Sequence, residues 1–206
     1  MVPLVSAQDS KPKDPLATGN NLPATFHSYN VNMAAPTADA APRPGKKDYV
    51  TRGKFHCLIS EYELDPTVML LVNGHDDSKG VQALLQKLDA AIENSRRARL
   101  RAFVVFVFDD LTNVVTQDEK REELAKRLER LVEDLKLRHV VVGLADKGEL
   151  EKYALGDGLT AVLYRKLRIA SAHRVAADKL EDAESPPLKA IVDDVTERFL
   201  PKKKTR

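Results

Sequence analysis

The sequence of 206 residues contains a single cysteine, Cys57, and this scarcity excludes two kinds of chemistry. One thiol cannot form a disulfide within the chain, and it cannot supply the pair of thiols of a Cys-x-x-Cys redox motif. An excess of charge is also missing, because 33 basic residues are offset by 31 acidic ones. Domains that bind nucleic acids usually carry a clear basic excess, so the composition argues against a nucleic-acid partner.

Long apolar runs are absent as well. The longest ones, such as residues 103–108, are far shorter than the roughly 20 residues that span a bilayer, so we expect no transmembrane helix. The phosphate-binding patterns G-x-G-x-x-G and G-x-x-x-x-G-K-[ST] do not occur either. Their absence argues against a doubly wound nucleotide-binding fold, and we predict no cofactor.

Composition divides the chain into a folded region and its flanks. Residues 1–22 are polar and contain Pro, Gly and Asn, which predicts a disordered N-terminal arm. Residues 23–200 predict one domain, interrupted at 33–48 by an Ala/Pro-rich insertion, and residues 201–206 predict a solvated basic tail. A domain of this length buries enough surface to fold without disulfides.

The first residues favour an exported protein. Val5-Ser6-Ala7 and the polar, Pro-containing stretch after it resemble the cleavage site of a secretory signal peptide. The basic and long apolar regions that normally precede such a site are not found, so either the start lies within a signal peptide or the match is coincidental. We expect a periplasmic or secreted bacterial protein, with a cytoplasmic one as the alternative.

Hydrophobic periodicity predicts strands in alternation with helices. We expect strands at 24–32, 54–60, 67–72, 101–108, 139–144, 160–166 and 168–175, and helices at 80–92, 116–137, 146–155 and 187–199. The longest helix opens with the capping-box spacing Thr116-x-x-Glu119. Since parallel strands need helical crossovers, this order predicts an α/β fold with a central mixed sheet of about five strands flanked by helices.

The order of strand-helix-strand, helix, hairpin and final helix resembles the thioredoxin-like superfamily. Residues 53–74 (GKFHCLISEYELDPTVMLLVNG) are similar to the beginning of its peroxiredoxin and secreted thiol-disulfide-reductase branch, where a Gly-Lys strand and a short turn lead to a Pro-led buried strand. Residues 151–175 (EKYALGDGLTAVLYRKLRIASAHRV) are similar to its last part, where a short helix precedes a hairpin. The likeness covers residues 24–199 and implies a thioredoxin-like fold.

The resemblance also implies where the reactive thiols of that superfamily would lie. They belong in the turn after Val72, at the start of the helix, and a cis-proline belongs beside them near residues 159–160. This chain has neither the thiols nor the proline. Because the thiolate is the nucleophile in disulfide exchange and in peroxide reduction, we expect neither activity there. The residues now at this position form a candidate binding site: His75, Asp76, Asp77, Ser78, Leu159 and Thr160.

Two roles fit the polar turn itself. His75, Asp76 and Asp77 supply a carboxylate-histidine group that can bind a cation or act as a general base, although no complete triad or ligand set accompanies it. Alternatively, Asp77 or Ser78 caps the helix that follows, and capping alone explains polar residues at this place.

Cys57 is the remaining catalytic candidate. With Ser60 it spells Cys-x-x-Ser, but it falls in a predicted strand rather than at a helix N-terminus. A packed core thiol and a reactive thiol both remain open interpretations. A metal site with His56 and His27 is disfavoured, because adjacent strand residues point to opposite faces, and we predict no metal. The acidic pair at 109–110 follows a central strand and is either a ligand site or a solvated turn.

We therefore predict a thioredoxin-like protein without dithiol redox activity, an exported binding or structural module with an unknown protein partner. The alternative is a divergent thiol oxidoreductase or peroxidase that uses Cys57. Oligomeric state is not predictable from these residues.

Overall fold

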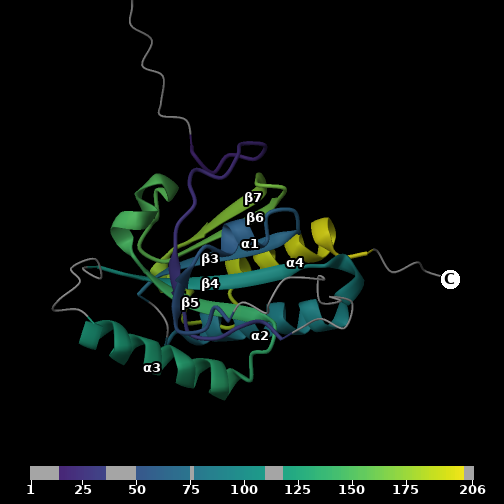
Figure 1. Ribbon diagram of the computed structural model, residues 1–206. Coiled ribbons are helices and arrows are strands. Elements are labelled where there is room, and N and C mark those ends of the chain that lie inside the picture. Colours follow the sequence, from purple (N-terminus) through teal and green to yellow (C-terminus); the bar gives the residue numbers. More distant parts are fainter. Residues whose placement is uncertain (1–13, 36–49, 75–76, 110–117, 202–206) are drawn as a thin grey trace, which may run out of the picture.

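The computed structural model describes residues 14–35, 50–74, 77–109 and 118–201. A seven-stranded mixed sheet runs through its centre in the order β2-β1-β5-β4-β3-β6-β7 (Figure 1). Three strands are parallel to one another: β3 (Thr67–Asn73), β4 (Arg101–Phe108) and β5 (Val140–Asp146). Antiparallel strands extend both sides: β6 (Leu159–Arg165) and β7 (Arg168–Val175) beyond β3, and β1 (Ser28–Asn30) and β2 (Lys54–His56) beyond β5.

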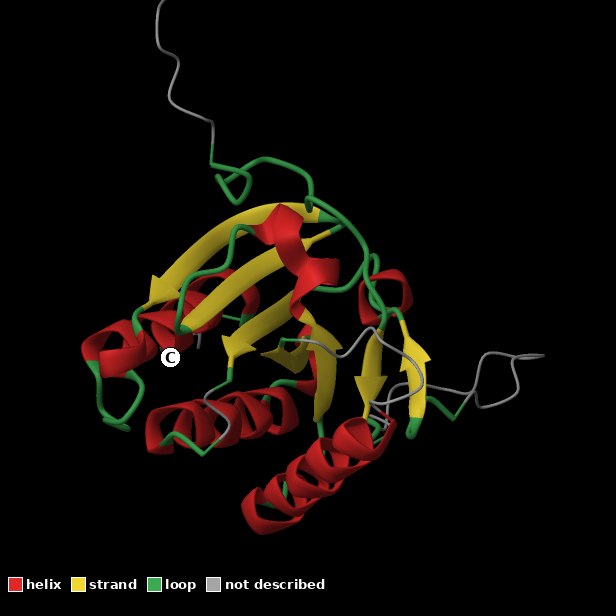
Figure 2. Cartoon of the chain, turned by 90° about the vertical axis from the view of Figure 1, so that its left-hand side faces the viewer, coloured by secondary structure: helices red, strands yellow, loops and turns green. Residues whose placement is uncertain are grey.

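Helices cover both faces of the sheet (Figure 2). One face carries the long helices α2 (Lys79–Asn94), α3 (Asp118–Leu135) and α4 (Pro186–Phe199). The other face carries α1 (Leu58–Glu61) and the 3-10 helix η2 (Lys147–Tyr153). Two further 3-10 turns, η1 (Arg96–Ala98) and η3 (Ala177–Lys179), lie in connections. No helix in the described part of the chain is long and apolar enough to cross a membrane.

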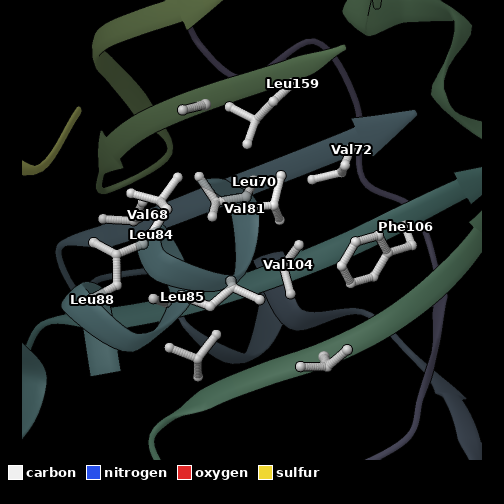
Figure 3. Close-up of a cluster of buried hydrophobic side chains, with 14 of the residues drawn as sticks. Val68, Leu70, Val72, Val81, Leu84, Leu85, Leu88, Val104, Phe106 and Leu159 are labelled. Carbon is white, nitrogen blue, oxygen red and sulfur yellow. The ribbon is translucent and has the colours of Figure 1, made fainter. Parts of the chain in front are cut away.

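The central strands are apolar throughout because both faces of the sheet are buried. Val68, Leu70 and Val72 of β3 pack against the long helices, whereas Met69 and Leu71 pack on the other face. Figure 3 shows the first of these layers, in which side chains of α2 meet those of β3, β4 and β6. The predicted mixed α/β fold is confirmed, with seven strands instead of about five, since the short β1 and β2 join the sheet.

Residues 14–22 lie along the outer edge of β7. The N–H of Gly19 donates to the Ile169 carbonyl (2.8 Å), and the Leu16 side chain is only 2% exposed. This packing differs from the disordered arm that the composition predicts, because an apolar residue within a polar segment reaches the core. Residues 1–13, the insertion from residue 36 onward and the tail after 201 lie outside the described residues, as does Thr116 of the predicted capping box.

The predicted strand at 54–60 is wrong beyond His56. β2 ends there, and α1 begins at Leu58 with Cys57 as its N-cap. The thiol accepts a hydrogen bond from the Ser60 N–H (3.4 Å), which is a local bond that favours a helical turn over a strand. Short apolar runs fit either structure, so periodicity alone could not separate them.

Candidate functional site

The turn after β3 is fastened to the loop that precedes β6. The side-chain amide of Asn73 donates to the Gly156 carbonyl (3.1 Å), and its backbone N–H donates to the Gly158 carbonyl (2.9 Å). Gly74 has a φ of 75°, a left-handed conformation that glycine adopts without strain. The predicted site residues His75 and Asp76 lie outside the described residues. The site is therefore described from Asn73, Gly74 and the residues from Asp77 onward.

Ser78 is the N-cap of α2, as one interpretation of the sequence predicts, but its hydroxyl does not cap the helix. It donates instead to the carbonyl of Leu180, in the loop between β7 and α4. The same carbonyl accepts the N–H of Gly80, in the first turn of α2, at 2.8 Å. Ser78 is 1% exposed and Leu180 is fully buried. The N-terminus of α2 is thus covered by a backbone carbonyl from a segment far along the chain.

The close approach of this segment depends on Gly80. A Cβ atom at this position would lie 2.3 Å from the Leu180 carbonyl oxygen and 2.6 Å from Leu188 Cδ1. No other residue type fits without a shift of the loop. The sequence signal for this contact is a glycine in the first turn of a strongly periodic helix.

Asp77, Leu159 and Thr160 do not form a single site with Ser78. Asp77 is exposed, and its carbonyl accepts from the Gln82 side chain (3.3 Å). Leu159 packs into the layer beneath α2, beside Val72 of β3 (Figure 3). Thr160 is the next residue of β6, so it points to the other face of the sheet and is 2% exposed. Two of the predicted binding residues are therefore buried on opposite faces.

Cys57 lies on the other face of the sheet from α2. Cys57 is 8% exposed and packs in the core cluster that contains residues of α1 and η2. Besides the Ser60 N–H, it is 3.2 Å from the Ser60 hydroxyl. The prediction of a packed thiol agrees with this burial, whereas the prediction that the residue is not at a helix N-terminus is wrong.

Three buried tyrosines share the core cluster of Cys57: Tyr62, Tyr153 and Tyr164. Burial, which disfavours the charged phenolate, raises the pKa of each well above its usual value. The hydroxyl of Tyr153 donates to the Ala24 carbonyl. These neutral, apolar surroundings show that the thiol is placed as a core side chain would be.

The histidines near Cys57 have other partners. His56 Nε2 lies 2.8 Å from a Glu61 carboxylate oxygen, and the backbone N–H of His27 donates to Glu149 (3.3 Å). Among the described residues no group of three or more His, Cys, Asp or Glu side chains is arranged to hold a metal ion. Asp109 is exposed and lies 3.4 Å from Lys147 Nζ, as in a solvated turn.

A polar cluster that the sequence analysis missed lies between β7 and α4. The Ser171 hydroxyl and His173 Nε2 both bond to one carboxylate oxygen of Asp194, and Arg198 bonds to the other. Burial opposes ionisation of Asp194, but the three hydrogen bonds outweigh it and lower its pKa. Because Ser171 donates to the carboxylate and not to the imidazole, the cluster lacks the serine-histidine contact of a nucleophilic triad. It fastens α4 to β7.

A shallow hollow lies beside η2, with a volume of about 200 Å³. Its lining includes Leu150, Ala154 and Leu155 together with Lys147 and Glu151. The volume of the hollow is below the range of about 300–1,000 Å³ that is usual for small-molecule sites. The hollow does not contain any of the predicted site residues.

No protein-family model matches the chain, and no curated protein sequence matches it. Among solved structures it is similar to a thiol:disulfide interchange protein from Bacteroides sp., with 12% identity over 92% of this chain and 94% of that one and a TM-score of 0.55. It is also similar to the thioredoxin domain of a thiol-disulfide oxidoreductase from Bacteroides vulgatus, with 14% identity over 90% and 99% and a TM-score of 0.54. A third likeness is to Mycobacterium bovis AhpC, with 14% identity over 93% and 98% and a TM-score of 0.50.

At these identities the likeness bears on the fold. The parallel β3, β4 and β5, the antiparallel β6 and β7 and the closing α4 agree with the order that the sequence predicts. Together with the solved structures, this arrangement shows that the protein has a thioredoxin-like fold.

Proposed function

We propose that this thioredoxin-like protein carries out no dithiol chemistry and serves as an exported binding or structural module. The observation that carries the proposal is the Leu180 carbonyl at the N-terminus of α2. This is the position where the resemblance to thiol-disulfide reductases would place reactive thiols.

A helix N-terminus activates a thiol because its free N–H groups and its dipole stabilise the thiolate. Here the Gly80 N–H is bonded to the Leu180 carbonyl, and the Ser78 hydroxyl is bonded to the same carbonyl. An attacking disulfide or peroxide would also need access, whereas Ser78 is 1% exposed. At Ser78 the hydroxyl is bonded and buried, so neither the electrostatic nor the steric requirement is met at this position.

The enzyme alternative rests on Cys57. The Ser60 N–H that points at its sulfur would stabilise a thiolate, which is the one observation in favour of a reactive thiol. Its burial, and its place across the sheet from α2, favour a structural role.

Thiol titration and activity assays distinguish the binding or structural module from the enzyme alternative. The Cys57 thiol of the native protein is expected to react with an aromatic disulfide reagent far more slowly than that of the unfolded protein. Insulin reduction and peroxide consumption are expected to equal those of the Cys57→Ser variant. Activity of the original protein above that of the Cys57→Ser variant would overturn the proposal and favour the oxidoreductase.

Export is part of the proposal and has its own support in the signal-peptide-like residues 5–7. Cell fractionation of the source organism, followed by mass spectrometry of the N-terminus, tests it. The protein is expected outside the cytoplasm, and a purely cytoplasmic protein would contradict export without affecting the thiol measurements.

A further inference from the structure

Folding sorts the charges of this nearly neutral chain to opposite ends of its strands. The starts of β3, β4 and β5 and the turn between β6 and β7 lie at one end of the sheet, as the strand registers require. Three segments there, 95–101, 136–139 and 165–168, contain nine basic residues and no acidic one: Arg96, Arg97, Arg99, Arg101, Lys136, Arg138, Arg165, Lys166 and Arg168. We call these nine residues the basic edge.

The opposite end of the strands is acidic. Among the described residues of its loops, ten carboxylates face three lysines. The carboxylates are Asp77, Asp109, Asp146, Glu149, Glu151, Asp157, Asp178, Glu181, Asp182 and Glu184, and the lysines are Lys147, Lys152 and Lys179. The balanced composition therefore conceals opposite charges in the described loops at the two ends of the strands.

Among the described residues, only part of the basic edge has an acidic partner. Arg99 and Arg101 share the carboxylate of Asp65, and Arg96 pairs with Glu93. Within the described part of the chain, six exposed cations have no carboxylate partner: Arg97, Lys136, Arg138, Arg165, Lys166 and Arg168. Adjacent cations without counter-ions repel one another, so a ligand that brings carboxylates would relieve this repulsion.

We propose that the basic edge binds an extended acidic segment of a partner protein; this rests on the proposed role as a binding module. Four of the six free cations are arginines, whose planar groups pair with carboxylates through two hydrogen bonds. From β5 to β7 the edge crosses four strand spacings, about 19 Å, which an extended segment of about six residues spans.

The exposed apolar and acidic residues of this edge favour a protein segment over other polyanions. Leu64 is 66% exposed beside Asp65 and offers an apolar contact. Glu63, which is also exposed, would repel a continuous phosphate surface, whereas a peptide can place its carboxylates on the arginines alone. The exposed large apolar residues of the described chain at this edge include no aromatic on which a base could stack.

Fluorescence anisotropy with a labelled ten-residue oligoglutamate peptide tests the proposal on the full chain. The peptide is expected to bind at low ionic strength and to weaken as salt rises. The combined Arg97→Gln, Arg138→Gln and Arg168→Gln variant is expected to bind about tenfold more weakly, a loss of about 1.4 kcal/mol. The matched control, Lys126→Gln, Arg130→Gln and Lys189→Gln, removes the same charge from the exposed surfaces of α3 and α4 and is expected to change binding less than about twofold.

Melting temperatures verify that both variants are folded. An equal loss in both would show that net charge alone governs binding and would overturn the proposal. The proposal would also be overturned if the original protein did not bind the peptide. It would likewise be overturned if the original protein bound duplex DNA or anionic vesicles more tightly than the peptide and the first variant abolished that binding. A reactive Cys57 would remove the proposed function and leave the peptide result standing, so the two failures are distinguishable.

Discussion

Gly80 is the residue on which the closure of α2 depends most directly. Its missing side chain leaves room for the Leu180 carbonyl, which accepts both the Gly80 N–H and the Ser78 hydroxyl. Any Cβ atom here would overlap backbone atoms, which move at greater cost than the end of a flexible side chain.

The Gly80→Ala variant is expected to lower the free energy of unfolding by about 2 kcal/mol, despite the better helix propensity of alanine. Urea unfolding measures the difference. Gly156→Ala is the matched control, because nothing lies within 4 Å of a Cβ at that position. It is expected to change stability by less than about 0.5 kcal/mol. Equal stability of the Gly80→Ala variant would mean that Leu180 does not approach as closely as the structure shows.

For single residues, the sequence predicts the place of a residue in a helix or strand better than the hydrogen bonds of its side chain. Ser78 was placed correctly at the start of α2, because capping residues and the apolar stripe after them are local signals. The direction of its hydroxyl could not be predicted, since the acceptor lies 102 residues further along the chain. Likewise, the left-handed Gly74 is a local signal, whereas Thr160 is buried in a strand that pairs with the distant β3.

At the scale of elements, α2 is tied to the start of β5 by one side chain. Asp89 Oδ1 accepts three consecutive backbone N–H groups, those of Arg138 (3.0 Å), His139 (2.7 Å) and Val140 (2.9 Å). Arg138 and His139 precede β5, and Val140 opens it. Charge-assisted bonds of this kind are stronger than neutral ones.

Asp89→Ala is expected to destabilise the protein by about 3 kcal/mol, because it leaves two partly buried donors and one exposed donor without their acceptor. Asp89→Asn keeps an acceptor oxygen and is expected to lose roughly half as much. Chemical denaturation measures the free energy of unfolding of each variant and checks which one loses more. Similar losses in both would show that the charge, and not the accepting oxygen, holds β5.

The segment 14–22 is fastened to β7 by an ion pair between Asp14 and Arg174, with N–O distances of 2.8 and 3.0 Å. The hydrogen bonds from Arg174 and from the Leu16 N–H lower the pKa of Asp14 to about 2 from 3.8. Docking therefore favours the ionised form. The contribution of ionised Asp14 to the docking of segment 14–22 is present above about pH 4 and is lost as the pH falls through about 2.

Hydrogen exchange of the Gly19 and Leu22 amides measures this docking. Their protection is expected to fall between about pH 4 and pH 2 in the original protein, after correction for intrinsic exchange rates. In Asp14→Asn the protection is expected to be low and without this transition. An identical transition in that variant would assign the pH dependence to another carboxylate.

Element boundaries show where periodicity stops being informative. The buried strands β3, β4 and β6 and the long helices were predicted to within a few residues, since their patterns extend over many positions. The four-residue α1 was not predicted, because KFHCLIS alternates like a strand and only the Cys57 cap distinguishes the two.

For the whole molecule, the order of elements was sufficient to predict the thioredoxin-like fold, whereas the segregation of charge was not predicted. The 33 basic and 31 acidic residues nearly balance over the whole sequence, so composition indicates a neutral surface. Parallel pairing then gathers the starts of the central strands at one end of the sheet and their ends at the other. The surface properties of the domain thus follow from topology and not from local pattern.

The central claim, that position 78 at the α2 N-terminus is closed to thiol chemistry, is tested most directly by placing a thiol there. In a Cys57→Ser background, Ser78→Cys is compared with Asp77→Cys, its exposed neighbour, by the rate of native reaction with an aromatic disulfide reagent. We expect Asp77→Cys to react readily and Ser78→Cys to react about a hundredfold more slowly until the protein unfolds. Native reaction of Ser78→Cys as fast as that of Asp77→Cys would contradict the account.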